Sequence, residues 1–266
     1  MPKWTTFPQT GEYAYDVARV KKNWARLHSG DSESLPKDDA VLQAWALYHS
    51  GDFQAATVAG LKAGAAGLSV ANKATCIYAT YLEKKEKTRL DLFLEVAKRA
   101  DAQLAENRQS DNVHASAQSS AHYWHAYAMG RYSQGISVAK ALAQGLGGKI
   151  KSSLETTIKL QPKHADAHIA LGAFHAEVID KVGTLIGGMT YGAKKDIGLK
   201  LFQDALKLNP GSPIAMVEYA NALVMLEGDK KLAEATRLYQ QAAEFKPLDA
   251  MEFLVVEMAR SDLQDA

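Results

Sequence analysis

The sequence predicts an all-α protein, a right-handed superhelical array of antiparallel helical hairpins. The first observation is a run, Ile-Lys-Leu-Gln-Pro at residues 158–162, that returns as Leu-Lys-Leu-Asn-Pro at 206–210 and more loosely at 243–247. The second is that alanine is abundant and prolines lie at joints between apolar segments. The third is that no long apolar-polar alternation, typical of a strand, occurs. A stack of repeats accounts for a chain of 266 residues without a domain boundary, because each repeat packs only on its neighbours.

Each copy of the run ends the second helix of a hairpin. Five residues before the proline stands a small residue, and three before that a bulky one. The pairs are Leu154 with Thr157, Phe202 with Ala205, and Tyr239 with Ala242. The small residue lets a neighbouring helix approach closely, and burial of the bulky one is worth about 1.5–3 kcal/mol. The proline ends the helix because it pushes the preceding residue out of the helical region.

The first helix of a hairpin follows the proline. Residues 168–175 and 216–223 place Gly172 and Ala220 where two helices touch, and residues 44–56 give a third copy that turns at Gly51. These segments resemble the tetratricopeptide repeat, Trp-x2-Leu-Gly-x2-Tyr followed by Ala-x3-Phe and Pro. The resemblance covers most of the chain from about residue 37, although 71–107 fits poorly. It implies a protein that holds a partner rather than converting a substrate.

The order of elements follows from these patterns. Residues 1–36 are expected to form an extended arm over 1–10 and an amphipathic helix over 12–27, and residues 37–266 the array. Helices of the array are expected at 38–50, 53–63, 70–83, 90–105, 113–132, 150–160, 165–182, 195–208, 214–226, 232–245 and 250–263.

Two connections interrupt this rhythm, at about 133–148 and 183–194. Both are apolar and rich in glycine, whereas an ordinary surface loop is polar because its backbone must be solvated. We expect these insertions to pack on each other, on another subunit or on a ligand. Insertions in repeat arrays often collect on one functional face.

A second, narrower resemblance spans residues 121–210. Its motifs are Ala-His-Tyr-Trp-His-Ala at 121–126, an apolar connection, the helix that ends at Pro162, and Ala-His-x2-Leu-Gly at 167–172. The segment is similar to the T-component of TRAP (tripartite ATP-independent periplasmic) transporters and to the regulator of microtubule dynamics proteins. In the transport branch such hairpins surround an apolar cavity and meet a solute-binding partner. The chain departs from that branch in showing no lipid-attachment cysteine near residue 1.

The charge distribution and the cysteine content argue against several classes of protein. The net charge is +1, with acidic and basic residues interspersed, whereas a nucleic-acid surface needs a clustered basic face. No run is long enough for a membrane span, and residues 1–8 do not read as a signal peptide. Cytoplasm is therefore the expected location, or the periplasm if the chain is processed. The single cysteine, Cys76, reads as a small buried hydrophobe.

Histidines are the richest candidates for chemistry. His122 with His125, and His164 with His168, are spaced to share a helix face and could begin a metal site. No acidic residue completes a motif such as His-Glu-x2-His, so buried, hydrogen-bonded histidine is favoured. Residues 187–194 lack the order that a phosphate-binding loop requires, and no nucleophile elbow occurs. We therefore expect no enzyme, catalytic residue, metal site or cofactor.

Alignment with the repeat places certain first-helix positions on a concave groove, which usually takes a helix or extended peptide by apolar contacts. These candidates are Val41, Trp45, Tyr48, His49, Ile169, Ala173, Ala176, Glu177, Val217, Asn221, Val224 and Met225. Trp45 and Tyr48 could equally pack on the preceding helix.

Three functional hypotheses follow. The first is a non-catalytic interaction module or scaffold that binds a protein or peptide partner through the groove. The second is an accessory protein that holds a lipophilic small molecule in a cavity lined by the insertions. Its ligand candidates are Val182, Leu185, Ile186, Met189 and Tyr191. The third is self-association into a homo-oligomer through the insertions.

Overall fold

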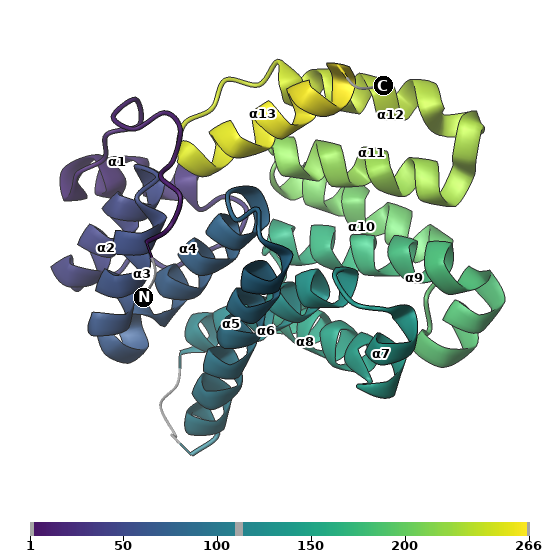
Figure 1. Ribbon diagram of the computed structural model, residues 1–266, viewed down its shortest axis with the longest axis horizontal. Helices are drawn as coiled ribbons and strands as arrows, with labels where there is room; N and C mark the ends of the chain where they lie inside the picture. The colour runs from purple at the N-terminus through teal and green to yellow at the C-terminus, as the bar shows by residue number, and fades with distance from the viewer. Residues whose placement is uncertain (1–2, 110–113, 265–266) are drawn as a thin grey trace. The chain divides into compact units, whose positions relative to one another are not determined.

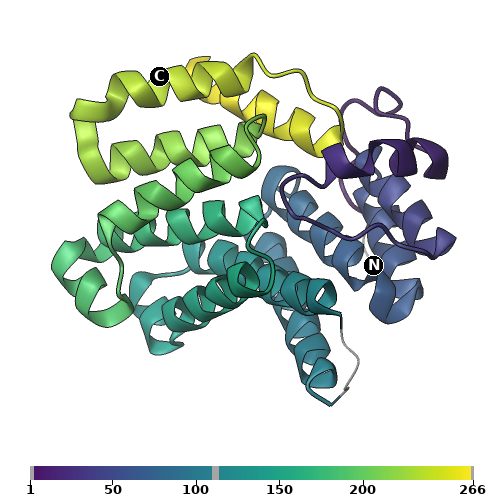
Figure 2. The same ribbon diagram turned by 180° about the vertical axis from the view of Figure 1, so that it is seen from behind.

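The computed structural model describes residues 3–109 and 114–264, which are helical and contain no strand (Figure 1, Figure 2). The all-α prediction is confirmed for this part of the chain. By their contacts the residues form two compact units. Unit 1 comprises Met1–His28, Glu33–Gln161 and Leu248–Met251, and unit 2 comprises Ser29–Ser32, Pro162–Pro247 and Glu252–Ala266.

Unit 1 is a succession of helices in which α2 packs on α3, α3 on α4, α4 on α5, α5 on α6, and α6 on α8. The elements are α1 (Val17–Leu27), α2 (Asp39–His49), α3 (Phe53–Lys62), the short 3-10 helix η1 (Gly64–Gly67), α4 (Leu68–Tyr81), α5 (Glu86–Asn107), α6 (Ala115–Gln134), α7 (Val138–Ala143) and α8 (Leu146–Leu160).

Aspartates begin the first three helices of unit 1. Asp16, Asp38 and Asp52 each precede a helix and accept a hydrogen bond from a backbone N–H of its first turn. Such caps satisfy donors that the helix cannot satisfy itself. Asp16 explains why the helix expected over 12–27 begins later, at Val17. The turn between α2 and α3 is at Gly51, as predicted, where φ is 88°.

The N-terminal arm packs on α3 and α4 of unit 1. The Trp4 ring stacks on Tyr78 with a centroid separation of 4.1 Å, and Phe7 is 3% exposed. A side chain at Gly51 would place its Cβ 2.5 Å from the Phe7 ring. Glycine at this turn therefore serves both the backbone conformation and the seating of the arm.

Unit 2 contains α9 (Ala165–Tyr191), α10 (Lys195–Leu208), α11 (Pro213–Glu227), the 3-10 helix η2 (Gly228–Lys231) and α12 (Leu232–Ala243). It also holds α13 (Ala250–Gln264), apart from its first two residues, which belong to unit 1. α9 packs on α10 and α11, and α11 on α12.

The repeated motif fills the cores as expected. Phe202 is fully buried and stacks on Tyr219 with centroids 5.4 Å apart. Gly172 of α9 lets the Phe202 ring approach, since a Cβ there would lie 2.8 Å from the ring. The small residues Thr157, Ala205 and Ala242 and the bulky Leu154 are also buried, and Tyr239 is half-buried.

The two insertions differ from expectation in being largely helical. Residues 138–143 form α7. The helix expected to end near 182 continues to Tyr191 after a break at Gly183, where φ is 79° and ψ is 160°. The start expected for α6, at 113, lies outside the described residues.

Candidate functional site

The groove predicted for the first hairpin is wrong, because its residues form the core of unit 1. Val41, Trp45, Tyr48 and His49 of α2 are at most 1% exposed. Trp24 of α1 meets the Trp45 ring edge-on at 5.8 Å. The second interpretation of Trp45 and Tyr48, packing on the preceding helix, is the one that the structure supports.

The remaining groove candidates lie in unit 2, so the candidates are not gathered in one surface of either unit. Ile169, Ala176 and Val217 are buried, which corrects their placement on an open groove. The partly buried residues are Ala173, Glu177 and Asn221. The Asn221 side-chain oxygen accepts a hydrogen bond from the Tyr239 hydroxyl at 2.6 Å. Only Val224 and Met225 are well exposed, at 44% and 40%.

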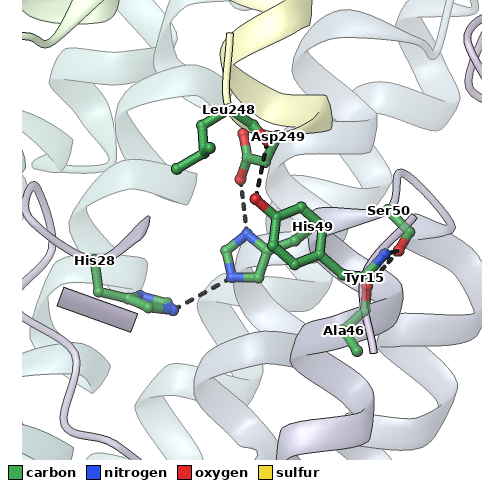
Figure 3. Close-up of polar contacts among 7 residues, drawn as sticks. All are labelled: Tyr15, His28, Ala46, His49, Ser50, Leu248 and Asp249. Carbon is green, nitrogen blue, oxygen red and sulfur yellow. Dashed lines mark hydrogen bonds and ion pairs between the residues drawn. The ribbon is translucent and has the colours of Figure 1, made fainter. Parts of the chain in front are cut away.

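A chain of buried polar side chains crosses the core of unit 1 (Figure 3). His49 Nδ1 donates to Asp249 Oδ2 over 2.7 Å, and the Nε2 atoms of His49 and His28 are 3.4 Å apart. The Tyr15 hydroxyl donates to the Leu248 carbonyl at 2.9 Å. All three members of the His28–His49–Asp249 chain are buried.

A carboxylate can only accept hydrogen bonds, so the proton of the His49–Asp249 contact lies on His49 Nδ1, and the Nε2 atoms of His49 and His28 face each other. Two hydroxyls are drawn in Figure 3: that of Tyr15 donates to the Leu248 carbonyl, and that of Ser50 donates to the Ala46 carbonyl. Through the contact between His49 and Asp249, the chain joins residues 248–251 to α2 within unit 1.

Sequence reasoning missed Asp249 and His28 as partners of His49. Asp249 is separated from His49 by 200 positions, and no motif links them. The only local indication in the sequence was the aromatic and histidine content of α1 and α2, which suggests that these two helices pack closely.

The segment after the break at Gly183 has an unusual distribution of side chains. The face of this segment that carries Gly187 packs against the preceding part of α9. Gly187 is buried, and a Cβ added to it would lie 3.1 Å from Val178 Cγ1. Its large side chains face outward: Leu185 is 75% exposed, Ile186 57% and Met189 82%. Helices normally bury such residues and expose small or polar ones. This inversion leaves three adjacent apolar side chains without packing partners of their own size.

Further exposed apolar residues lie at the same end of unit 2. We define the apolar edge as Leu185, Ile186, Met189, Ile197, Val224, Met225 and Leu232. They lie at the end of α9, the start of α10, the end of α11 and the start of α12, and Figure 2 shows these helix ends along one side of the unit. The edge holds seven of the twelve large apolar side chains that are exposed in the described chain.

Paired charges surround the apolar edge. Lys195 Nζ lies 2.8 Å from Glu227, Lys231 Nζ is 2.8 Å from Glu234, and Lys181 Nζ is 3.5 Å from Glu177. The hydrogen bond from Lys195 lowers the pKa of Glu227, and that with Glu234 raises the pKa of Lys231. Both shifts favour the charged forms, so these lysines are matched by carboxylates.

Of the remaining ligand candidates, Val182 and Tyr191 are partly buried. In α7, which lies in unit 1, Val138 and Leu142 are 42% and 45% exposed. The insertions therefore leave several of their large apolar side chains exposed, although Leu146 is buried.

The histidine pairs behave largely as buried, hydrogen-bonded residues. His125 Nδ1 lies 3.0 Å from the Ser153 hydroxyl, and His164 Nδ1 accepts from the Ala167 N–H at 3.1 Å. Burial lowers the pKa values of His122 and His125, which keeps the imidazoles neutral. Residues 3–109 and 114–264 contain no group of three or more metal-ligating side chains.

No protein-family model matches the chain, and no curated protein is significantly similar to it. Within the described residues, no helix has both the length and the apolar character needed to cross a membrane.

Proposed function

We propose that this chain is a non-catalytic binding protein that holds a protein partner through the apolar edge. The observation that carries the proposal is the outward orientation of Leu185, Ile186 and Met189. The opposite face of the same helical segment is rich in glycine and packs inward. Burial of each such side chain is worth about 1.5–3 kcal/mol. Three together supply a useful part of a binding free energy.

The chemistry of the edge favours an apolar polypeptide segment as its occupant. Lys181, Lys195 and Lys231 each pair with a carboxylate, so acidic and basic groups are mixed here, unlike the clustered cationic face that nucleic acid needs. Met189 and Met225 add flexible side chains that adapt to irregular apolar partners. An amphipathic helix that presents its apolar side is a common ligand of such surfaces. The tetratricopeptide resemblance supports the same class of function.

The test compares two multiple variants in affinity purification from the native host. The edge variant combines Leu185→Ser, Ile186→Ser and Met189→Ser. The matched control combines Val138→Ser and Leu142→Ser, which removes exposed apolar side chains from α7. Both should keep the wild-type circular dichroism spectrum and Tm, because the replaced side chains are solvent-exposed. We expect a stoichiometric protein partner that the control retains and the edge variant loses.

Other outcomes would replace the proposal. A partner retained equally by both variants would exclude the edge as its site. A larger species by light scattering that becomes monomeric in the edge variant would identify self-association. A lipophilic molecule bound without any protein would favour the hypothesis of an accessory ligand-binding protein.

A further inference from the structure

A polar strip lies on α4 inside unit 1. Asn72, Thr75 and Cys76 are at most 1% exposed, and their spacing of three and four residues places them on one face of the helix. The surrounding residues of α4 are mostly alanine, valine and isoleucine. A buried asparagine in such a setting is costly unless its amide is hydrogen-bonded.

Two side chains at this strip have buried atoms without partners. Neither Oδ1 nor Nδ2 of Asn72 has a hydrogen-bond partner in the described part of the chain, and the same holds for Nε and Nη1 of Arg99 on α5. Each unsatisfied buried group costs about 1–3 kcal/mol, and charged groups cost more. Four such atoms on two neighbouring side chains call for a specific explanation.

Thr75, three residues after Asn72 on α4, contacts Arg99 but cannot satisfy its remaining donors. Arg99 Nη2 donates to the Thr75 hydroxyl at 3.0 Å. That hydroxyl itself donates to the Ala71 carbonyl at 2.8 Å and lies 3.3 Å from the Thr57 hydroxyl. Its hydrogen-bonding capacity is therefore used. The contact fixes the guanidinium beside the polar strip while leaving Nε and Nη1 without acceptors.

The charge at this place is positive. The carboxylate of Glu95 lies 3.8 Å from Arg99 Nη2, beyond hydrogen-bond distance, on a side chain that is 51% exposed. A second guanidinium, that of Arg131, also acts on the Cys76 thiol. Burial raises the pKa of Cys76 and of Tyr127, so both groups stay protonated and neutral. Within the described residues, the carboxylate paired with Arg99 is that of Glu95, and it is partly solvated.

We propose that Arg99 and Asn72 form a binding site for a small oxyanion, a carboxylate or phosphate group, between α4 and α5. An oxyanion supplies the negative charge and the acceptor oxygens that the guanidinium lacks, and such charge-assisted hydrogen bonds are the strong ones. Asn72 Nδ2 adds a neutral donor. The Arg99 side chain is 15% exposed, although its Nε and Nη1 atoms and the amide of Asn72 are themselves buried. This inference is independent of the apolar edge.

The experiment is calorimetric titration with inorganic phosphate and with acetate, at constant ionic strength in chloride. We expect saturable binding of at least one anion to the wild-type protein. Arg99→Met should weaken binding by about tenfold or more, because it removes the charged donors. Lys98→Met removes the same charge from the exposed neighbouring position of α5 and should change binding by less than about twofold.

Asn72→Asp keeps the test decisive if Arg99→Met does not fold. An aspartate at this position supplies its own carboxylate to Arg99. We therefore expect it to abolish anion binding and to raise the Tm measured without added anion. Wild-type protein that binds neither anion, or an Asn72→Asp variant that still binds with wild-type affinity, would overturn the proposal and leave water as the partner of these atoms.

Discussion

At the scale of single residues, polar groups in the core of unit 1 do more than fill space. The His28–His49–Asp249 chain connects side chains from distant parts of the sequence (Figure 3). A buried hydrogen bond to a charged group adds only about 1.5–3 kcal/mol of net stability, because desolvation offsets its attraction. Removal of one partner is nevertheless costly, since the other is then buried without compensation.

Asp249→Ala should therefore lower the free energy of unfolding by about 2–4 kcal/mol. Glu155→Ala is the matched control, an acidic residue on α8 of unit 1 whose side chain is 53% exposed and pairs with Lys151. Its loss should be under about 1 kcal/mol, as for other surface pairs. Urea denaturation followed by tryptophan fluorescence measures both, because Trp24 and Trp45 lie beside His28 and His49. Equal losses in the two variants would contradict the buried contact.

At the scale of elements, close approach between helices explains why the repeated motif needs small residues. The contact of α9 with α10 is made at Gly172 and Gly198, where added methyl groups would lie 2.8 Å from Phe202 and 3.0 Å from His175. The Phe202 ring is fully buried and stacked, so it cannot move aside. The positions of small and bulky residues in the sequence thus set how closely α9 and α10 approach each other.

Gly172→Ala should destabilise the protein by about 1–2 kcal/mol, since overpacking costs about 1–3 kcal/mol and better helix propensity offsets roughly 0.5–1 kcal/mol of it. Gly130→Ala in α6 is the control, because nothing lies within 4 Å of its added methyl group. It should stabilise by up to about 1 kcal/mol. The two midpoints are compared by far-ultraviolet circular dichroism. A Gly172→Ala protein at least as stable as wild type would show that the contact is loose.

Much of the helix order could be predicted because it depends on local pattern. The helix expected at 195–208 has those bounds in α10, and prolines and capping aspartates mark other ends. The insertions were harder, because glycine-rich apolar segments do not show whether a helix continues through them. Gly183 breaks α9 without ending it.

The candidate sites were less predictable because they depend on contacts between distant residues. Trp45 and Tyr48 have the same helical spacing whether they face a groove or a neighbouring helix, and only the packing of α1 decides between the two. The pairing of His49 with Asp249 likewise has no local signal. Leu185, Ile186 and Met189 could be named from the sequence as ligand candidates, because large apolar residues among glycines are conspicuous, but their exposure could not be predicted.

At the scale of the whole molecule, the chain crosses between two compact units more than once. Residues 248–251 return to unit 1 after the helices of unit 2, and residues 29–32 belong to unit 2 although they precede α2. The four tryptophans of the sequence, Trp4, Trp24, Trp45 and Trp124, all belong to unit 1. Tryptophan fluorescence therefore reports on unit 1, whereas circular dichroism reports on the helices of both units.

This distribution of tryptophans allows a test of whether the units unfold as one. We expect two cooperative transitions, because each unit has a core of its own, and probes of a single transition would coincide. Gly172→Ala, in unit 2, should then shift the circular dichroism curve and leave the fluorescence midpoint within error of wild type. Asp249→Ala, in unit 1, should lower the fluorescence midpoint. Coincident curves in the wild type, with both variants shifting both probes equally, would mean that the crossings at 29–32 and 248–251 couple the units into a single cooperative molecule.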